Sequence, residues 1–233
     1  MSEPLNEAAQ EAADVLARSL DAVFESLQVL REAAGPLLNS PKVTSLDLML
    51  LEPTVRELID RHRGLVDGAG LAVAPGLLGD AETWMQSWHT HGGQPSFTRH
   101  NLNPASVNYY DYTHTSWYQR PVASGQAVLT GPYWDFGGTD TTIITASLPV
   151  PGPENKVSVV AADLSVHHLE VTFLRALGKQ DLPVALVSES GKVVASNSAR
   201  YAVGRTAAAD VSARSVALPM KSLTDPWQVV FPR

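Results

Sequence analysis

A long run of helical periodicity opens the chain, over residues 3–34. Apolar side chains recur there in alternating steps of four and three residues, at Leu16, Leu20, Val23, Leu27 and Leu30. This spacing is typical of the apolar seam of a coiled coil, and Gly35–Pro36 predicts the end of the helix. The stripe therefore either packs on a sheet of the same chain or pairs, over part of its length, with a second copy to form a homodimer.

A second helix is expected after Thr44. Its buried face would carry Leu46, Met49, Leu50, Val55, Leu58 and Ile59. Pro53 lies inside this stretch and has no backbone N–H, so the helix is expected either to kink or to divide into two short helices.

Patterns typical of strands follow. Residues 66–74 and 83–89 predict the first two strands, the second because large apolar and polar residues alternate. Residues 91–108 are rich in Gly, Pro, Asn and Ser and predict a loop. The later elements are a short helix over residues 116–123, strands over 126–130, 141–150 and 156–162, a helix over 164–177, a hairpin over 183–196 and one closing strand.

This order of elements predicts an α+β fold with mostly antiparallel strands. The long N-terminal helix is expected along one face of the sheet, and residues 109–140 over the other. We therefore expect a helical segment over residues 1–62, followed by one α+β domain over residues 63–233.

Composition narrows the classes of partner. Among 233 residues, 17 Lys and Arg face 24 Asp and Glu, which gives a formal charge of −7, and there is no cysteine. Without a basic block, nucleic acid is not an expected partner. The N-terminus lacks the pattern of an export signal, and no run approaches the roughly 20 apolar residues that span a bilayer. A cytoplasmic location without a membrane partner is expected.

The richest chemistry lies between residues 109 and 163, where aromatic side chains stand near carboxylates. The candidate ligand-binding residues are Trp117, Tyr118, Tyr133, Asp135 and Asp163, with Trp88 as a further wall and His114 as a further contact. Carboxylates attract a positive charge, and ring faces stabilise a cation by roughly 0.5–2 kcal/mol. The alternatives are that the rings are core residues, that Asp163 caps the following helix and that Asp135 is a turn residue.

Signals for catalysis are weak. The chain has no G-x-S-x-G, P-loop or G-x-G-x-x-G motif. His89 and His91 form an H-x-H pair, but without a helical H-E-x-x-H frame or nearby carboxylates we expect neither a metal site nor a cofactor. Hydrolysis by paired carboxylates is the enzymatic alternative, and it requires two acids with separated pKa values in one cleft.

Four motifs in order resemble the Cache (PDC-type) sensor domains of bacterial receptors. They are Trp117–Tyr118, Gly131–Pro132–Tyr133–Trp134–Asp135, the strand 145–150 that ends in Pro149–Val150, and Asp163–Leu164–Ser165. The resemblance covers residues 65–198 and includes the terminal hairpin. It implies a PAS-like antiparallel sheet behind a long N-terminal helix, and a domain that binds a small molecule.

The resemblance also implies a set of ligand contacts. In members that bind amino acids, a Tyr, an Arg two residues before the Trp-Tyr pair, a later Tyr and two Asp hold the ligand. Here these positions hold Tyr110, Thr115, Trp117–Tyr118, Tyr133, Asp135 and Asp163. The Thr115 hydroxyl cannot form the paired, charge-assisted hydrogen bonds that a guanidinium makes to a carboxylate. His114 and Arg120 lie nearby in the sequence, but neither occupies the Arg position of the pattern.

The residues of the pattern that would hold the ligand's ammonium group are thus all present, which favours a small amine or an amino-acid-like ligand. A free-standing cytoplasmic sensor of this kind would signal by contact with a transcriptional regulator or a kinase. A dimeric scaffold with a degenerate pocket is the remaining alternative.

Overall fold

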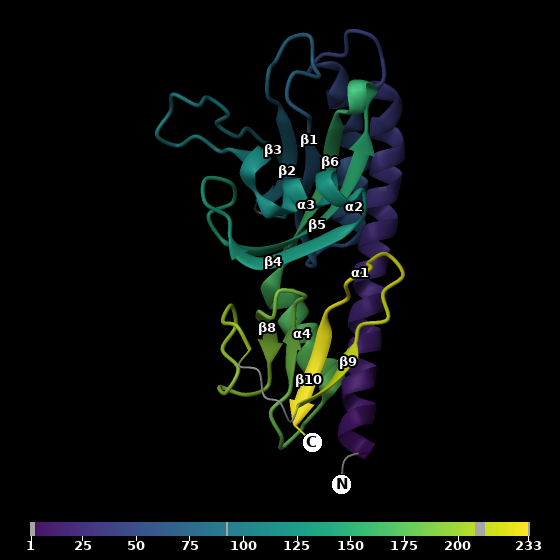
Figure 1. Ribbon diagram of the computed structural model, residues 1–233, viewed down its shortest axis with the longest axis vertical. Helices are drawn as coiled ribbons and strands as arrows, with labels where there is room; N and C mark the ends of the chain where they lie inside the picture. Colours follow the sequence, from purple (N-terminus) through teal and green to yellow (C-terminus); the bar gives the residue numbers. More distant parts are fainter. Residues whose placement is uncertain (1–2, 92, 208–212, 233) are drawn as a thin grey trace.

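One helix, α1 (Glu3–Leu38), runs the length of the molecule, and two antiparallel sheets lie one beyond the other along it (Figure 1). The computed structural model describes residues 3–91, 93–207 and 213–232. The N-terminal half of α1 lies beside the second sheet and its C-terminal half beside the first. The predicted α+β class, with an antiparallel sheet and a long N-terminal helix, is confirmed.

The first sheet has six strands in the order β3-β2-β1-β6-β5-β4. Their bounds are β1 Val66–Ala72, β2 Met85–His91, β3 Gln94–Thr98, β4 Val128–Trp134, β5 Thr142–Pro151 and β6 Val157–Ser165. Helices α1 and α2 (Glu52–Arg61) cover one face, and α3 (Ser116–Ser124) with its flanking loops covers the other. Three short 3-10 helices complete this part: η1 Asp47–Leu51, η2 Tyr112–His114 and η3 Pro153–Asn155.

The second sheet has four strands in the order β8-β7-β10-β9. Their bounds are β7 Ala185–Val187, β8 Val193–Ser196, β9 Ala213–Ala217 and β10 Gln228–Pro232. Helix α4 (Val166–Leu177) begins directly after β6 and carries the chain from the first sheet to the second, packed against α1. The sequence predicts the hairpin and a closing strand but does not separate them into a second sheet.

The apolar stripe of α1 is buried within the chain. Leu16, Val23, Leu27 and Leu30 are fully buried, and Leu20 is nearly so. Packing of this stripe on the chain's own sheets is therefore confirmed. A homodimer through α1 stays a prediction, and it would have to use the opposite face of the helix, which carries Glu11 and Arg18.

Two boundaries differ from the prediction at the first helices. Helix α1 continues past Gly35–Pro36 to Leu38, because Pro36 removes a hydrogen bond only in the last turn and Leu38 is fully buried. Leu46 and Leu50 are 78% and 71% exposed instead of buried. The 3-10 geometry of η1 has three residues per turn, so it turns Leu48 and Leu51 inward in their place.

Two strand predictions also need correction. Strand β3 lies in the region expected to be a loop; it is an edge strand that pairs with β2 alone, and its polar composition hides it. Strand β6 continues to Ser165, so Leu164 belongs to the strand and not to the following helix. Ser165 caps α4 by accepting from the backbone N–H of His168, so the alternative role of Asp163 as the cap is wrong.

The burial of the α1 stripe gives a test of stability. Replacing Leu27 with Ala should lower the free energy of unfolding by about 2–5 kcal/mol, because it leaves a cavity between α1 and the sheets. Val29 on the same helix is 53% exposed, so Val29→Ala should change it by only about 0.5 kcal/mol. Urea denaturation of both variants measures the difference; equal effects would contradict the packing described here.

Candidate functional site

One row of paired residues crosses the first sheet and forms the floor of the site. His89 on β2 pairs with Gly68 on β1, Gly68 pairs with Asp163 on β6, and Asp163 pairs with Thr145 on β5. Neighbours such as Trp88, Ile144 and Leu164 pack in the core beneath α1 and α2. Because side chains alternate along a strand, His89, Thr145 and Asp163 all point to the α3 side.

Gly68 makes the contact between His89 and Asp163 possible. A Cβ atom at position 68 would lie 2.0 Å from Cδ2 of the His89 ring, so any side chain there would clash with the ring. The ring instead lies over the glycine and places Nε2 3.1 Å from Oδ2 of Asp163. Nδ1 of His89 lies 3.1 Å from the Thr98 hydroxyl, so both ring nitrogens have a partner.

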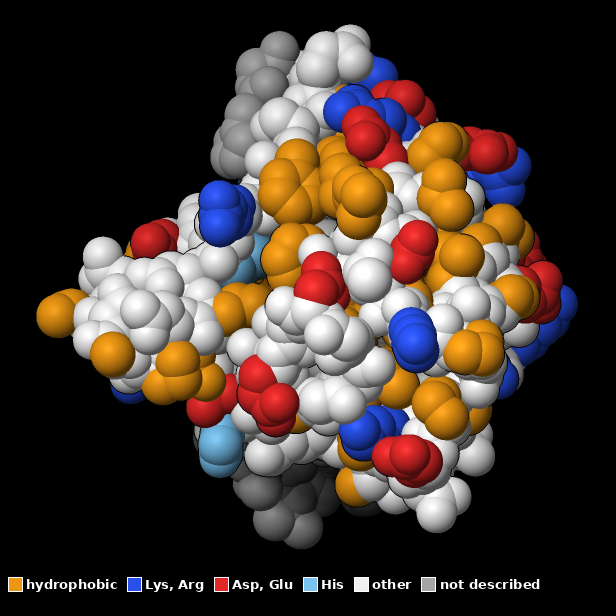
Figure 2. All heavy atoms as spheres, turned by 90° about the horizontal axis from the view of Figure 1, so that it is seen from above, with side chains coloured by type: hydrophobic (Ala, Val, Ile, Leu, Met, Phe, Trp, Pro, Cys, Tyr) orange, Lys and Arg blue, Asp and Glu red, His pale blue; other side chains and the backbone are white. Residues whose placement is uncertain are grey.

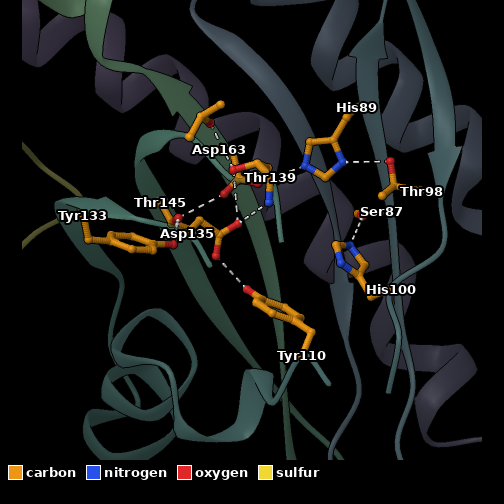
Figure 3. A network of polar contacts seen from close by, with 11 residues as sticks. Ser87, His89, Thr98, His100, Tyr110, Tyr133, Asp135, Thr139, Thr145 and Asp163 are labelled. Atoms are coloured by element: carbon orange, nitrogen blue, oxygen red, sulfur yellow. Dashed lines mark hydrogen bonds and ion pairs between the residues drawn. The ribbon is translucent and has the colours of Figure 1, made fainter. Parts of the chain in front are cut away.

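Asp163 also accepts a hydrogen bond from the other side of the row. The Thr145 hydroxyl donates to Oδ1 of Asp163 at 2.9 Å, and it lies 2.7 Å from the Tyr133 hydroxyl (Figure 3). Because the Thr145 proton goes to Asp163, the Tyr133 hydroxyl is the donor to Thr145. Burial and the nearby charge of Asp163 raise the pKa of Tyr133, which keeps this chain of donors protonated.

Asp135, just beyond the end of β4, faces the same cavity as Asp163 (Figure 3). Its Oδ1 accepts from the Tyr110 hydroxyl at 3.0 Å, and its Oδ2 accepts from the backbone N–H of Thr139 at 2.8 Å. Gly138 leaves room for it, since a Cβ there would lie 2.0 Å from Oδ2. Asp135 as a residue is 5% exposed, and burial followed by repulsion from Asp163 raises the pKa of its carboxyl.

A second histidine completes the wall. His100 stacks on the Tyr110 ring at 5.2 Å, and its Nε2 lies 2.8 Å from the Ser87 hydroxyl. Burial, with the neighbouring His89, lowers the pKa of His100 to about 4, so its ring is neutral near pH 7. The cavity therefore contains two carboxylates and no permanent positive charge, an arrangement that favours a cation.

The cavity is narrow in this structure. Its volume is about 20 Å³, and one water molecule needs about 10–15 Å³ measured in this way. A ligand larger than water can enter only if the wall moves.

A larger, open cleft of about 720 Å³ lies on the other side of that wall. It runs between the α3–β4 region and the β7–β8 hairpin of the second sheet. Four residues line both hollows, namely Tyr110, Trp117, Tyr133 and Asp135. These side chains are thus the partition between the inner cavity and the outer cleft.

The structure brings together five of the eight candidate residues. Asp163 lines the inner cavity and not the outer cleft. The partition residues Asp135, Tyr110, Tyr133 and Trp117 line both. The two aspartates thus face one hollow.

Three candidates lie elsewhere. Tyr118 is a core residue: its hydroxyl donates to the Val157 carbonyl at 3.1 Å, and its ring packs edge-on against Tyr112. Trp88 is fully buried on the opposite face of the sheet, where strand alternation must place it once His89 faces the cavity. His114 lines only the outer cleft, where Nδ1 lies 2.7 Å from Asp111.

Several residues of the site carry no local signal in the sequence. The sequence marks His89 only as half of an H-x-H pair, and the side chain of His91 lies outside the described residues. Thr145, His100 and Thr139 are not singled out. The alternation of β5 and β6 would have placed Thr145 beside Asp163, but only with the register between the strands in hand.

The comparisons with known proteins agree with this fold. Residues 66–171 match the family model described as methyl-accepting chemotaxis protein-like, first PDC sensor domain. Over these residues the resemblance to the Cache (PDC-type) sensor domains is confirmed.

Solved structures show the same fold over nearly the whole chain. The ligand-binding domain of the Pseudomonas aeruginosa PAO1 amino acid chemoreceptor PctB, in complex with L-Arg, is 16% identical, with a TM-score of 0.67, over 99% of this chain and 93% of its own. The PctC domain from the same organism, in complex with GABA, is 18% identical, with a TM-score of 0.63, over 98% and 97%. The extracellular domain of the putative histidine kinase mmHK1S-Z3 is 13% identical, with a TM-score of 0.66, over 100% and 96%.

Three further observations bear on partners. Within the described residues, no helix is both long and apolar enough to cross a bilayer. Nor does that part of the chain gather three or more His, Cys, Asp or Glu side chains as a metal site would. On the face drawn in Figure 2, acidic and basic side chains are interspersed among those shown in colour, without the broad basic area that a phosphate backbone requires.

The raised pKa of Asp135 predicts a pH dependence. A carboxyl whose pKa is higher in the folded state stabilises the fold below its unfolded pKa of about 3.9 and loses that contribution as pH rises through the folded pKa. Asp135→Asn, which carries no charge, should therefore gain stability relative to the parent protein between pH 4 and pH 7. Denaturant unfolding across this range measures the difference, and parallel curves would contradict the assignment.

Proposed function

We propose that this protein is a sensor that binds a small amine or amino-acid-like molecule on the α3 side of its first sheet. The observation that carries the proposal is that Asp135 and Asp163 line one small cavity with Tyr110, Tyr133 and Trp117. A protonated amine placed there would offset part of the negative charge of the two acids and meet aromatic faces. The chemoreceptor domains PctB and PctC, whose structures hold L-Arg and GABA, have the same fold.

Asp163 is the proposed anchor of the ammonium group. A carboxylate offers about four acceptor positions, and in this structure Asp163 uses one on each oxygen, for Thr145 and His89. It can therefore accept further donors from a ligand without losing its position. Asp135 accepts three hydrogen bonds, one from Tyr110 and two from Thr139, and it is the more deeply buried acid, so its proposed part is to close the wall and add negative charge.

Transmission of the signal is proposed to begin at β6. Asp163 stands three residues before α4, which packs against α1 and against β8 of the second sheet. Entry of a ligand must move the wall of a cavity the size of one water, and this displacement would reach both sheets through α4 and the partition. Binding shifts such an equilibrium only by the ligand's differential affinity for the two states.

The proposed output is contact with a partner protein, either a transcriptional regulator or a kinase, and the proposed location is the cytoplasm. We propose no catalysis, because the sequence carries no G-x-S-x-G, P-loop or G-x-G-x-x-G motif.

The anchor role of Asp163 gives a binding test. Asp163→Asn should weaken binding of n-butylamine by at least about tenfold, since a hydrogen bond to a charged group contributes about 1.5–3 kcal/mol and about 1.4 kcal/mol is tenfold. Isothermal titration calorimetry gives the affinities. The matched control is Asp181→Asn, because Asp181 is exposed and does not line the cavity.

Both variants should keep the circular dichroism spectrum of the parent protein. An Asp163→Asn protein that is folded and binds the amine with unchanged affinity would remove the basis of the proposal.

A further inference from the structure

We propose that the outer cleft binds the anionic end of the same ligand, with Lys192 of the second sheet as its counter-charge. The ligand class would then be an extended zwitterion, in which an amine and a carboxylate are separated by a chain. This inference rests on the proposed function for the amine end, and it adds a second subsite in a different part of the fold.

The outer cleft has the size and position of a binding site. Its volume of about 720 Å³ falls within the roughly 300–1,000 Å³ of typical small-molecule sites. One side is formed by α3 and the end of β4, including Trp134, and the other by the β7–β8 hairpin, with Ser190 and Lys192. An occupant would therefore contact both sheets at once.

The basic side chains of the cleft are not equally free. Arg120 forms an ion pair with Glu189, which also accepts from the Trp227 indole N–H at 2.9 Å. His114 lies 2.7 Å from Asp111. These two groups are therefore already matched with carboxylates.

Lys192 is the exception. Its ammonium donates to the Pro132 carbonyl at 3.4 Å, and within the described residues no carboxylate forms an ion pair with it. It is half-buried in the cleft wall of a protein whose formal charge is −7. A partly buried ammonium without a counter-ion favours an anion beside it.

The same cleft contains Thr115, the residue that stands where the amino-acid-binding pattern has Arg. Its hydroxyl is taken by the Tyr112 carbonyl at 2.6 Å. A carboxylate in the cleft would thus find no free donor at Thr115 and a free ammonium at Lys192. The positive charge available to a carboxylate therefore lies in the β7–β8 hairpin, at Lys192, and not at the start of α3.

The partition sets the length of the ligand. The ammonium site at Asp163 and the anion site at Lys192 lie on opposite sides of side chains that include Tyr110 and Tyr133. Atoms in contact with the two faces of one ring are about 7 Å apart, whereas the nitrogen and carboxyl carbon of an α-amino acid are separated by only two bonds, or about 2.5 Å. A spacer of about four to six carbons fits both sites.

Calorimetry with three probes tests this inference: n-hexylamine, hexanoate and 6-aminohexanoate. On the parent protein, 6-aminohexanoate should bind at least about tenfold more tightly than n-hexylamine, as expected for a charge-assisted contact. Lys192→Gln should abolish that gain and leave the affinity for n-hexylamine unchanged. Lys179→Gln, at an exposed lysine outside the cleft, should keep the gain.

The outcomes separate the two proposals. If n-hexylamine fails to bind but hexanoate binds in a manner that depends on Lys192, the anion subsite stands and the amine site is wrong. If the distal carboxylate adds no affinity on the parent protein, or if the gain survives Lys192→Gln in a folded variant, the anion subsite is overturned.

Discussion

The site depends on one contact, that of His89 with Asp163 across Gly68. A carboxylate within a sheet loses hydration, and that cost is offset only when its oxygens are hydrogen-bonded. Asp163 obtains one donor from its neighbour Thr145 in the adjacent strand. The second comes from two strands away, and it can arrive only because position 68 has no side chain. This arrangement keeps a negative charge inside the first sheet, and the rest of the cavity is built around it.

The aromatic partition links this charge to the second sheet. Tyr110 and Tyr133 each bond on the inner side, to Asp135 and Thr145, while they also face the outer cleft. Beyond them, Arg120 joins α3 to the second sheet through Glu189. A ligand that moves the partition must therefore alter contacts between the sheets. Because both sheets lie along α1, a displacement at this small cavity would reach the whole length of that helix.

Much of the fold could be predicted because its signals are local. The stripe of α1, the strands β5 and β6 and the final hairpin each carry their own local apolar pattern. Predictions were wrong where geometry overrides pattern, as in the 3-10 turn that exposes Leu46 and Leu50, or at Tyr118, whose ring packs inward. The pairing of His89 with Asp163 joins residues 74 positions apart, and that of Lys192 with Pro132 joins residues 60 apart. Neither has a local signal, so register and tertiary packing were needed to find them.

The most direct test of the account is carbon and nitrogen NMR of Asp163 and His89 during titration with n-butylamine. If Asp163 holds the ammonium group, its carboxyl ¹³C resonance and the Nε2 resonance of His89 should both shift and saturate together with the heat of binding. Saturation by the amine with both resonances unchanged would contradict the central claim that this carboxylate receives the ligand's charge.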